Sequence, residues 1–178
     1  MLLAAVLGTF ILGSTSCHKN NNNTTKPTLY DSLGGTTMVA DPANPGKMIE
    51  KGYLGIRSVV DSAVFIIAGD AAINGYFKVL IGEVTAGNTS GFQKLSANLS
   101  NFIAVATGAK DYTYTGLSMT VAHDPAQNTR ITAKVDSQDF DSFVGDVAKS
   151  ATKNGVPANL ITSLGKLLYT VESQVVQR

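Results

Sequence analysis

One histidine stands where the sequence could support metal chemistry. His123 ends the segment that begins at Tyr112, and Met119 lies one turn earlier on the same face of the short helix predicted there. The only other histidine, His18, lies in a polar tail. A neutral imidazole in apolar surroundings can be an axial ligand of an iron. A single histidine in a domain of this size is more often structural or at the surface, so the motif alone is weak evidence for a ligand.

The composition indicates one ordinary folded domain. The chain has 178 residues, of which 15% are charged, and its formal net charge is +1. This length is sufficient for a single domain with a sizeable core. The sequence shows neither a basic patch nor an acidic tail, so we expect no nucleic-acid partner.

The N-terminal residues resemble an export signal. Residues 2–12 are almost all apolar, a stretch too short to span a bilayer but typical of a signal-peptide core. Small residues follow, and then comes Cys17, the only cysteine, as at a bacterial lipoprotein cleavage site. We expect residues 1–17 to be a signal peptide cleaved before Cys17. Lipidation of Cys17 would anchor the protein to a membrane of the bacterial cell envelope, and plain secretion is the alternative.

The polar residues 18–27, which include a run of four asparagines, predict a flexible tether. The folded domain is expected over residues 28–178. With a single cysteine the chain forms no internal disulfide, so its stability must depend on packing.

Apolar residues at steps of three and four predict helices along most of this domain. The expected helices cover residues 29–33, about 45–67, 88–107, a short helix ending at 123, 136–153 and 157–175, with a short helix or pair of turns at 70–80. Polar surface loops are expected at 41–46 and 124–134. No stretch alternates convincingly as a strand does, so the predicted fold class is all-α.

Five segments, in order, resemble group I truncated hemoglobins. They span most of the domain, from residue 28 to residue 176. The matching segments are Thr28–Gly35, Val59–Asp61 with Asp70–Phe77, Phe102–Ala109, Tyr114–His123 and Asn154–Pro157. Two stretches depart from the family by insertion, around residues 41–51 and in the loop after His123.

The resemblance implies a two-over-two helical sandwich, the truncated globin fold, with heme b (protoheme) between the long distal helix and His123. It implies that His123 is the proximal ligand of the heme iron. The residues expected around the heme are, besides His123, the aromatic Phe77 and the pocket residues Leu99, Phe102, Ile103, Tyr114 and Met119.

The distal side departs from the family pattern. Where group I members place a tyrosine on the second helix, this chain has Val64, and where a glutamine often stands on the long helix it has Leu99, with Leu95 one turn earlier. Tyr53 lies three turns upstream of Val64, too far to substitute. We therefore expect an apolar distal pocket without a hydrogen-bond donor, which argues against tight oxygen storage and against peroxidase chemistry.

Three functions follow from the resemblance. The first is a heme-binding globin of the cell envelope that binds a diatomic gas, namely dioxygen, nitric oxide or carbon monoxide, and depends on an unknown reductase. The second is an enzyme of the same fold, a nitric oxide dioxygenase or peroxidase. The third is a heme-free, globin-shaped interaction lipoprotein. His123 argues against the third, and the apolar Val64 and Leu99 argue against the second.

Overall fold

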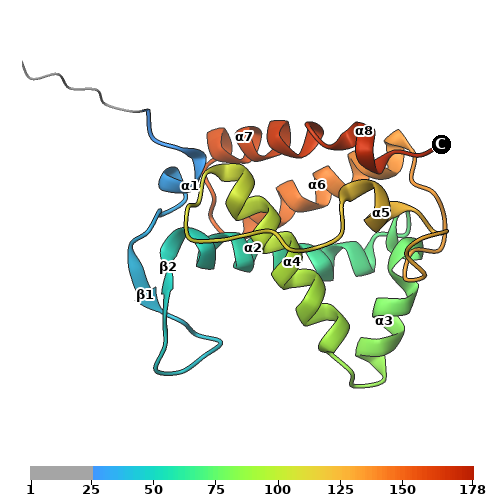
Figure 1. The fold of residues 1–178 in the computed structure, drawn as a ribbon, viewed down its shortest axis with the longest axis horizontal. Coiled ribbons are helices and arrows are strands. Elements are labelled where there is room, and N and C mark those ends of the chain that lie inside the picture. Colours follow the sequence, from blue (N-terminus) through green and yellow to red (C-terminus); the bar gives the residue numbers. More distant parts are fainter. Residues whose placement is uncertain (1–25) are drawn as a thin grey trace, which may run out of the picture.

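The computed structural model describes residues 26–178 (Figure 1). The expected leader, Cys17 and nearly all of the tether lie outside these residues. The elements, in chain order, are α1 Leu29–Ser32, β1 Met38–Ala40, β2 Met48–Glu50, α2 Lys51–Gly69, the 3-10 helix η1 Asn74–Phe77, α3 Lys78–Thr85, α4 Ser90–Thr107, α5 Met119–His123, α6 Ser137–Lys153, α7 Ala158–Tyr169 and α8 Glu172–Val175.

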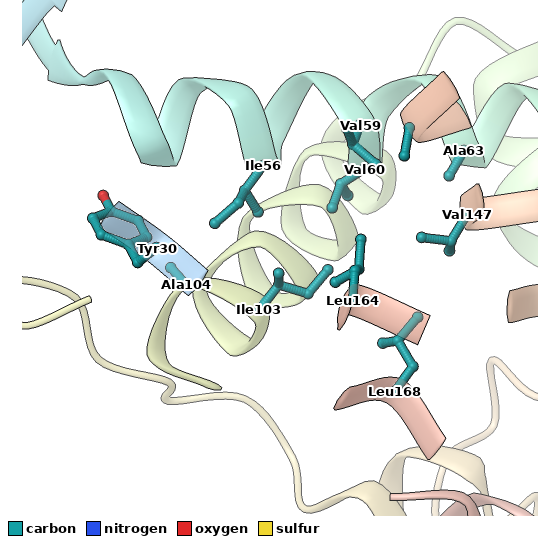
Figure 2. Packing of buried hydrophobic residues seen from close by; sticks show 11 residues of the cluster. Tyr30, Ile56, Val59, Val60, Ala63, Ile103, Ala104, Val147, Leu164 and Leu168 are labelled. Carbon is teal, nitrogen blue, oxygen red and sulfur yellow. The ribbon is translucent and has the colours of Figure 1, made fainter. Parts of the chain in front are cut away.

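Four long helices form the body of the molecule, and α2 is its centre. Helix α2 packs against α4 on one side and against α6 on another, and α6 packs in turn on α7 (Figure 1). The main core lies where these helices meet, and its side chains point toward one another (Figure 2). The labelled members are Tyr30, Ile56, Val59, Val60, Ala63, Ile103, Ala104, Val147, Leu164 and Leu168. This arrangement confirms the predicted all-α class.

Helix α2 is also long and apolar enough, by length and composition, to cross a membrane. Six of its residues are buried in the fold, at the spacing of three and four expected of a core helix. Its apolar character is therefore accounted for by its central position between α4 and α6.

Side-chain caps and glycines set the helix ends near the candidate site. Asp136 and Asp139 form a reciprocal capping box at the start of α6, which satisfies backbone N–H groups that have no partner within the helix. Helix α4 ends at Gly108, whose φ of 105° lies in the left-handed region. A Cβ there would also lie 2.9 Å from the Thr28 side chain, so glycine suits both the turn and the close approach.

A two-stranded hairpin corrects the expectation that the domain has no strands. Strands β1 and β2 are antiparallel, with Val39 opposite Ile49, and the predicted loop 41–46 connects them. Arg57 of α2 fastens this loop through Asp41, with its Nη2 2.7 Å from a carboxylate oxygen. Strands of three residues are too short for an alternating pattern to be recognised. Because β2 occupies residues 48–50, α2 begins at Lys51, six residues later than predicted.

Two further boundaries differ from the predictions. The last helix is not continuous to Val175, because it ends at Tyr169 and resumes as α8 at Glu172. The Thr170 hydroxyl donates to the carbonyl of Leu167 at this break. Pro157 is the residue before α7 rather than a residue of its first turn, with an extended ψ of 143°.

Candidate functional site

His123 is held in one tautomer by the backbone of its own helix. Its Nδ1 lies 2.8 Å from the carbonyl oxygen of Met119, one turn earlier in α5. A carbonyl can only accept a hydrogen bond, so Nδ1 carries the hydrogen and Nε2 is left as the unprotonated nitrogen. Burial lowers the pKa of His123, and the hydrogen bond to Met119 opposes this shift. The ring is therefore neutral at pH 7 and can donate its Nε2 lone pair to a metal ion.

Helix α5 has only five residues and depends on partners from elsewhere in the chain. Ser118 begins it, and its hydroxyl oxygen accepts from the N–H of Val121 at 3.3 Å. At its end the carbonyl of Thr120 accepts from the Gln177 side-chain amide at 3.1 Å, and that of Ala122 accepts from Asn128 at 2.7 Å. These carbonyls belong to the last turn, where an α-helix supplies no partners of its own.

The long loop after His123 is fastened to α5 through Asn128, and its later residues are fastened to η1 and α3. Arg130 forms a bidentate ion pair with Glu83 of α3, at 2.9 and 2.5 Å. The Thr132 hydroxyl donates to the carbonyl of Gly75 at 3.0 Å, and the Tyr76 hydroxyl lies 3.2 Å from the Lys134 carbonyl. The inserted loop is thus anchored on η1 and α3, and α5 ends at His123 as the sequence predicted.

Helix α4 has a buried face and a half-buried apolar stripe beside it. Its buried residues, among them Ile103, pack toward the core. Leu95, Leu99 and Phe102, at steps of four and three, are only half-buried. Phe102 contacts Tyr114, in the segment that leads to α5, with ring centroids 5.7 Å apart and the rings nearly perpendicular. The stripe therefore offers an apolar surface next to the segment that carries the proximal motif.

Two hydrogen bonds connect polar side chains of α2 with polar side chains of α4. The Ser96 hydroxyl donates to Asp61, and the Tyr53 hydroxyl donates to Asn101 at 2.8 Å. Val64 belongs to α2, is half-buried and carries no polar group. The Tyr53 hydroxyl is thus paired with Asn101, and that it does not replace a tyrosine at position 64 stays a prediction.

The remaining predicted site residues occupy different environments. Phe77 is the last residue of η1 and is half-buried. Met119 packs on a second apolar cluster, around Val135, Phe140 and Val175. Ile103 is 2% exposed and belongs to the main core, so any contact of Ile103 with a bound group remains a prediction.

Sequence reasoning missed the two side chains that support α5 from outside, Asn128 and Gln177. The Gln177 amide reaches Thr120 across 57 positions of the chain. Single polar residues in loops and tails have no periodic pattern, so no sequence signal identifies them. The stacked pair of Tyr53 and Tyr112, with centroids 4.1 Å apart, was missed for the same reason.

His123 is a single potential metal ligand, which suits a metal whose other ligands come from a macrocycle such as a porphyrin. Within residues 26–178 no three histidine, cysteine or acidic side chains form a group that could hold a metal ion. One neutral imidazole beside apolar side chains is the protein contribution typical of heme ligation. The Met119 carbonyl is the partner that fixes such a ring in orientation.

Two cavities lie at other places in the fold. A groove of about 670 Å³ runs between α2 and α6, with Phe65, Asp70 and Lys149 on its walls. A cavity of about 20 Å³ lies in the core beside Ile103 and Leu164. His123 lines neither of the two.

Comparison with known proteins identifies the fold. No family model matches the chain, and no curated protein matches it in sequence. Among solved structures, the truncated hemoglobin of Tetrahymena pyriformis in its Fe(III) form matches with a TM-score of 0.60 and 18% sequence identity, over 85% of this chain and 100% of that chain. Single-substitution variants of that protein, with a tyrosine changed to phenylalanine or a glutamine to glutamate, match equally well. The chain therefore has the truncated globin fold.

Proposed function

We propose that this protein binds heme b through Nε2 of His123 and holds a diatomic gas on the opposite side of the iron. The observation that carries the proposal is the 2.8 Å contact between His123 Nδ1 and the Met119 carbonyl, at the end of α5 in a truncated globin fold. When bound, heme would supply an iron that can take dioxygen, nitric oxide or carbon monoxide.

The residues of this chain have separable tasks in that function. His123 donates the nitrogen ligand, and the Met119 carbonyl keeps its ring oriented and raises its basicity. Leu95, Leu99 and Phe102 cover the heme with apolar surface and exclude water. Val64, Leu95 and Leu99 offer no proton, so the distal side discriminates among ligands by size and polarity rather than by a hydrogen bond.

The same proposal includes a place of action and a partner. The leader and Cys17 favour attachment to the bacterial cell envelope through a lipid, as expected for a lipoprotein related to group I truncated hemoglobins. A heme iron that binds dioxygen must be kept reduced, so we include a reductase of unknown identity among the partners.

Heme titration of the purified full-length protein tests this function. The wild-type protein should bind one heme and show a Soret band, and His123→Ala should lose it. His18→Ala is the matched control, because it removes the other histidine and should leave the spectrum unchanged. Circular dichroism shows whether each variant is folded. An unaltered Soret band in folded His123→Ala would refute His123 as the ligand.

A further inference from the structure

The last three residues of the chain contact α5, the helix that carries His123, and the segment that leads into α6. After α8, the residues Val176, Gln177 and Arg178 run beside the start of α6 and the short helix α5 (Figure 1). Val176 pairs with Val135 as a parallel bridge, and the N–H of Gln177 donates to the carbonyl of Val135 at 2.8 Å. We call Val176, Gln177 and Arg178 the C-terminal clamp.

Gln177 connects the clamp directly to the helix that carries His123. Its side-chain amide donates to the carbonyl of Thr120 at 3.1 Å. A helix of five residues is too short to be stable alone, and its final carbonyls need partners from outside. Thr120 follows Met119, whose carbonyl orients the His123 ring, so the Gln177 contact fixes the turn of backbone on which that ring depends.

Arg178 holds the clamp in place through charge. Its Nη2 lies 3.0 Å from a carboxylate oxygen of Asp139 and 3.1 Å from one of Asp136. The Tyr76 hydroxyl donates to the same oxygen of Asp139 at 2.5 Å. Arg178 therefore joins the tail to the first turn of α6 and to η1. Tyr76 also packs against the apolar cluster on which Met119 packs.

We propose that Gln177 and Arg178 are positioning residues for His123. The clamp sets the tilt of α5, and with it the direction of the Nε2 lone pair toward the iron. This inference depends on the proposed function for its heme readouts. It implies that loss of the clamp changes proximal geometry while His123 itself remains intact.

The test uses single substitutions in the full-length protein. Gln177→Glu keeps size but replaces the amide donor with a carboxylate, which cannot donate to the Thr120 carbonyl at neutral pH. Arg178→Ala removes the ion pairs, and Arg178→Lys keeps the charge. Arg57→Ala is the matched control, because it breaks another Arg–Asp pair, in the hairpin loop at the other end of the molecule (Figure 1).

Two readouts report on the proximal side. The rate of heme loss to an excess of acceptor globin should rise about 2- to 10-fold in Gln177→Glu and Arg178→Ala, the range for loss of one hydrogen bond. The iron–histidine stretching band of the reduced protein should shift in both. Arg178→Lys should bring the rate of heme loss and the stretching band most of the way back to their wild-type values. Arg57→Ala should change neither the rate nor the band. Heme loss and a stretching band equal to those of wild type in Gln177→Glu and Arg178→Ala would overturn the inference.

A readout on the heme-free protein separates the two proposals. Amide hydrogen exchange at Val121 and Ala122 should become faster in Gln177→Glu, because α5 loses its support whether or not heme is present. If wild type binds no heme but this acceleration is seen, the clamp acts on α5 while the proposed function fails. Exchange in α5 that is unchanged relative to wild type would refute the clamp itself.

Discussion

At the scale of single residues, the site depends on what His123 has and what Val64 lacks. The imidazole is neutral, oriented by the Met119 carbonyl and left with Nε2 as its unprotonated nitrogen. Two polar pairs connect α2 and α4, Ser96 with Asp61 and Tyr53 with Asn101, whereas the buried Ser100 hydroxyl of α4 has no partner among the described residues. We expect a ligand on the iron to meet the apolar side chains at positions 64, 95 and 99.

Val64→Tyr tests this distal side. A hydroxyl at position 64 would supply the hydrogen-bond donor that the pocket lacks, so dioxygen should dissociate roughly 10- to 100-fold more slowly. Carbon monoxide should be affected much less, because it carries little charge when bound. Stopped-flow measurement of both off-rates checks the prediction. The larger side chain should also cost about 1–3 kcal/mol of stability, measured separately by denaturant unfolding.

An unchanged dioxygen off-rate in a folded, heme-loaded Val64→Tyr variant would show that position 64 does not face the ligand. The assignment of the distal residues along α2 would then be wrong. The rest of the argument from His123 would remain.

At the scale of elements, the hairpin shows how an insertion is accommodated. Residues 41–51, which we expect to be an insertion relative to truncated hemoglobins, form the loop after β1, the strand β2 and the first residue of α2, at the end of the molecule far from α5 (Figure 1). The pKa of Asp41 is lowered well below its usual range. The largest cause is the hydrogen bond from the Arg57 guanidinium, and the next is the hydrogen bond from Asn44. The insertion is therefore fastened to α2 by an ionised carboxylate.

The pH dependence of stability follows from that shift. Because the pKa of Asp41 is lowered in the folded state, its contribution is complete above the unfolded pKa of about 3.9 and is lost as the pH falls toward the folded value. Asp41→Asn should be less stable than wild type at pH 7, and the gap should narrow as the pH falls below about 4. Urea unfolding at both pH values measures it. A gap that does not change with pH would contradict the ion-pair explanation.

Helix periodicity predicted the long elements but not their connections. The spacing of Leu95, Leu99 and Phe102 was sufficient to predict α4 and its apolar stripe, and the Tyr114–His123 segment predicted α5. The hairpin was missed because three-residue strands leave no period to detect. The break between α7 and α8 was missed because Val171 and Val175 continue the helical pattern across it. That break lets α8 turn toward α5, a tertiary effect that local sequence does not encode.

At the scale of the whole molecule, the fold and the cellular location depend on different parts of the chain. The truncated globin fold lies within residues 26–178, and 85% of the chain matches the Tetrahymena protein. Cys17 and the apolar stretch before it lie outside those residues, so envelope attachment remains a prediction from the sequence.

Metabolic labelling tests the attachment. Labelled palmitate should enter the wild-type protein expressed in a bacterium and should not enter Cys17→Ser, because no other cysteine is present. Fractionation should place the wild type with membranes. Equal labelling of both proteins, or an uncleaved leader on cytoplasmic protein, would show that Cys17 is not the lipid site.

The coordination of the reduced heme tests the central claim most directly. Resonance Raman and absorption spectra of the dithionite-reduced, reconstituted protein should show five-coordinate, high-spin iron with an iron–imidazole stretching band. The band should vanish in His123→Gly and return when imidazole is added, because the cavity left by the side chain admits the free ligand. A six-coordinate, low-spin ferrous spectrum without added ligand, or a band that persists in His123→Gly, would contradict the account.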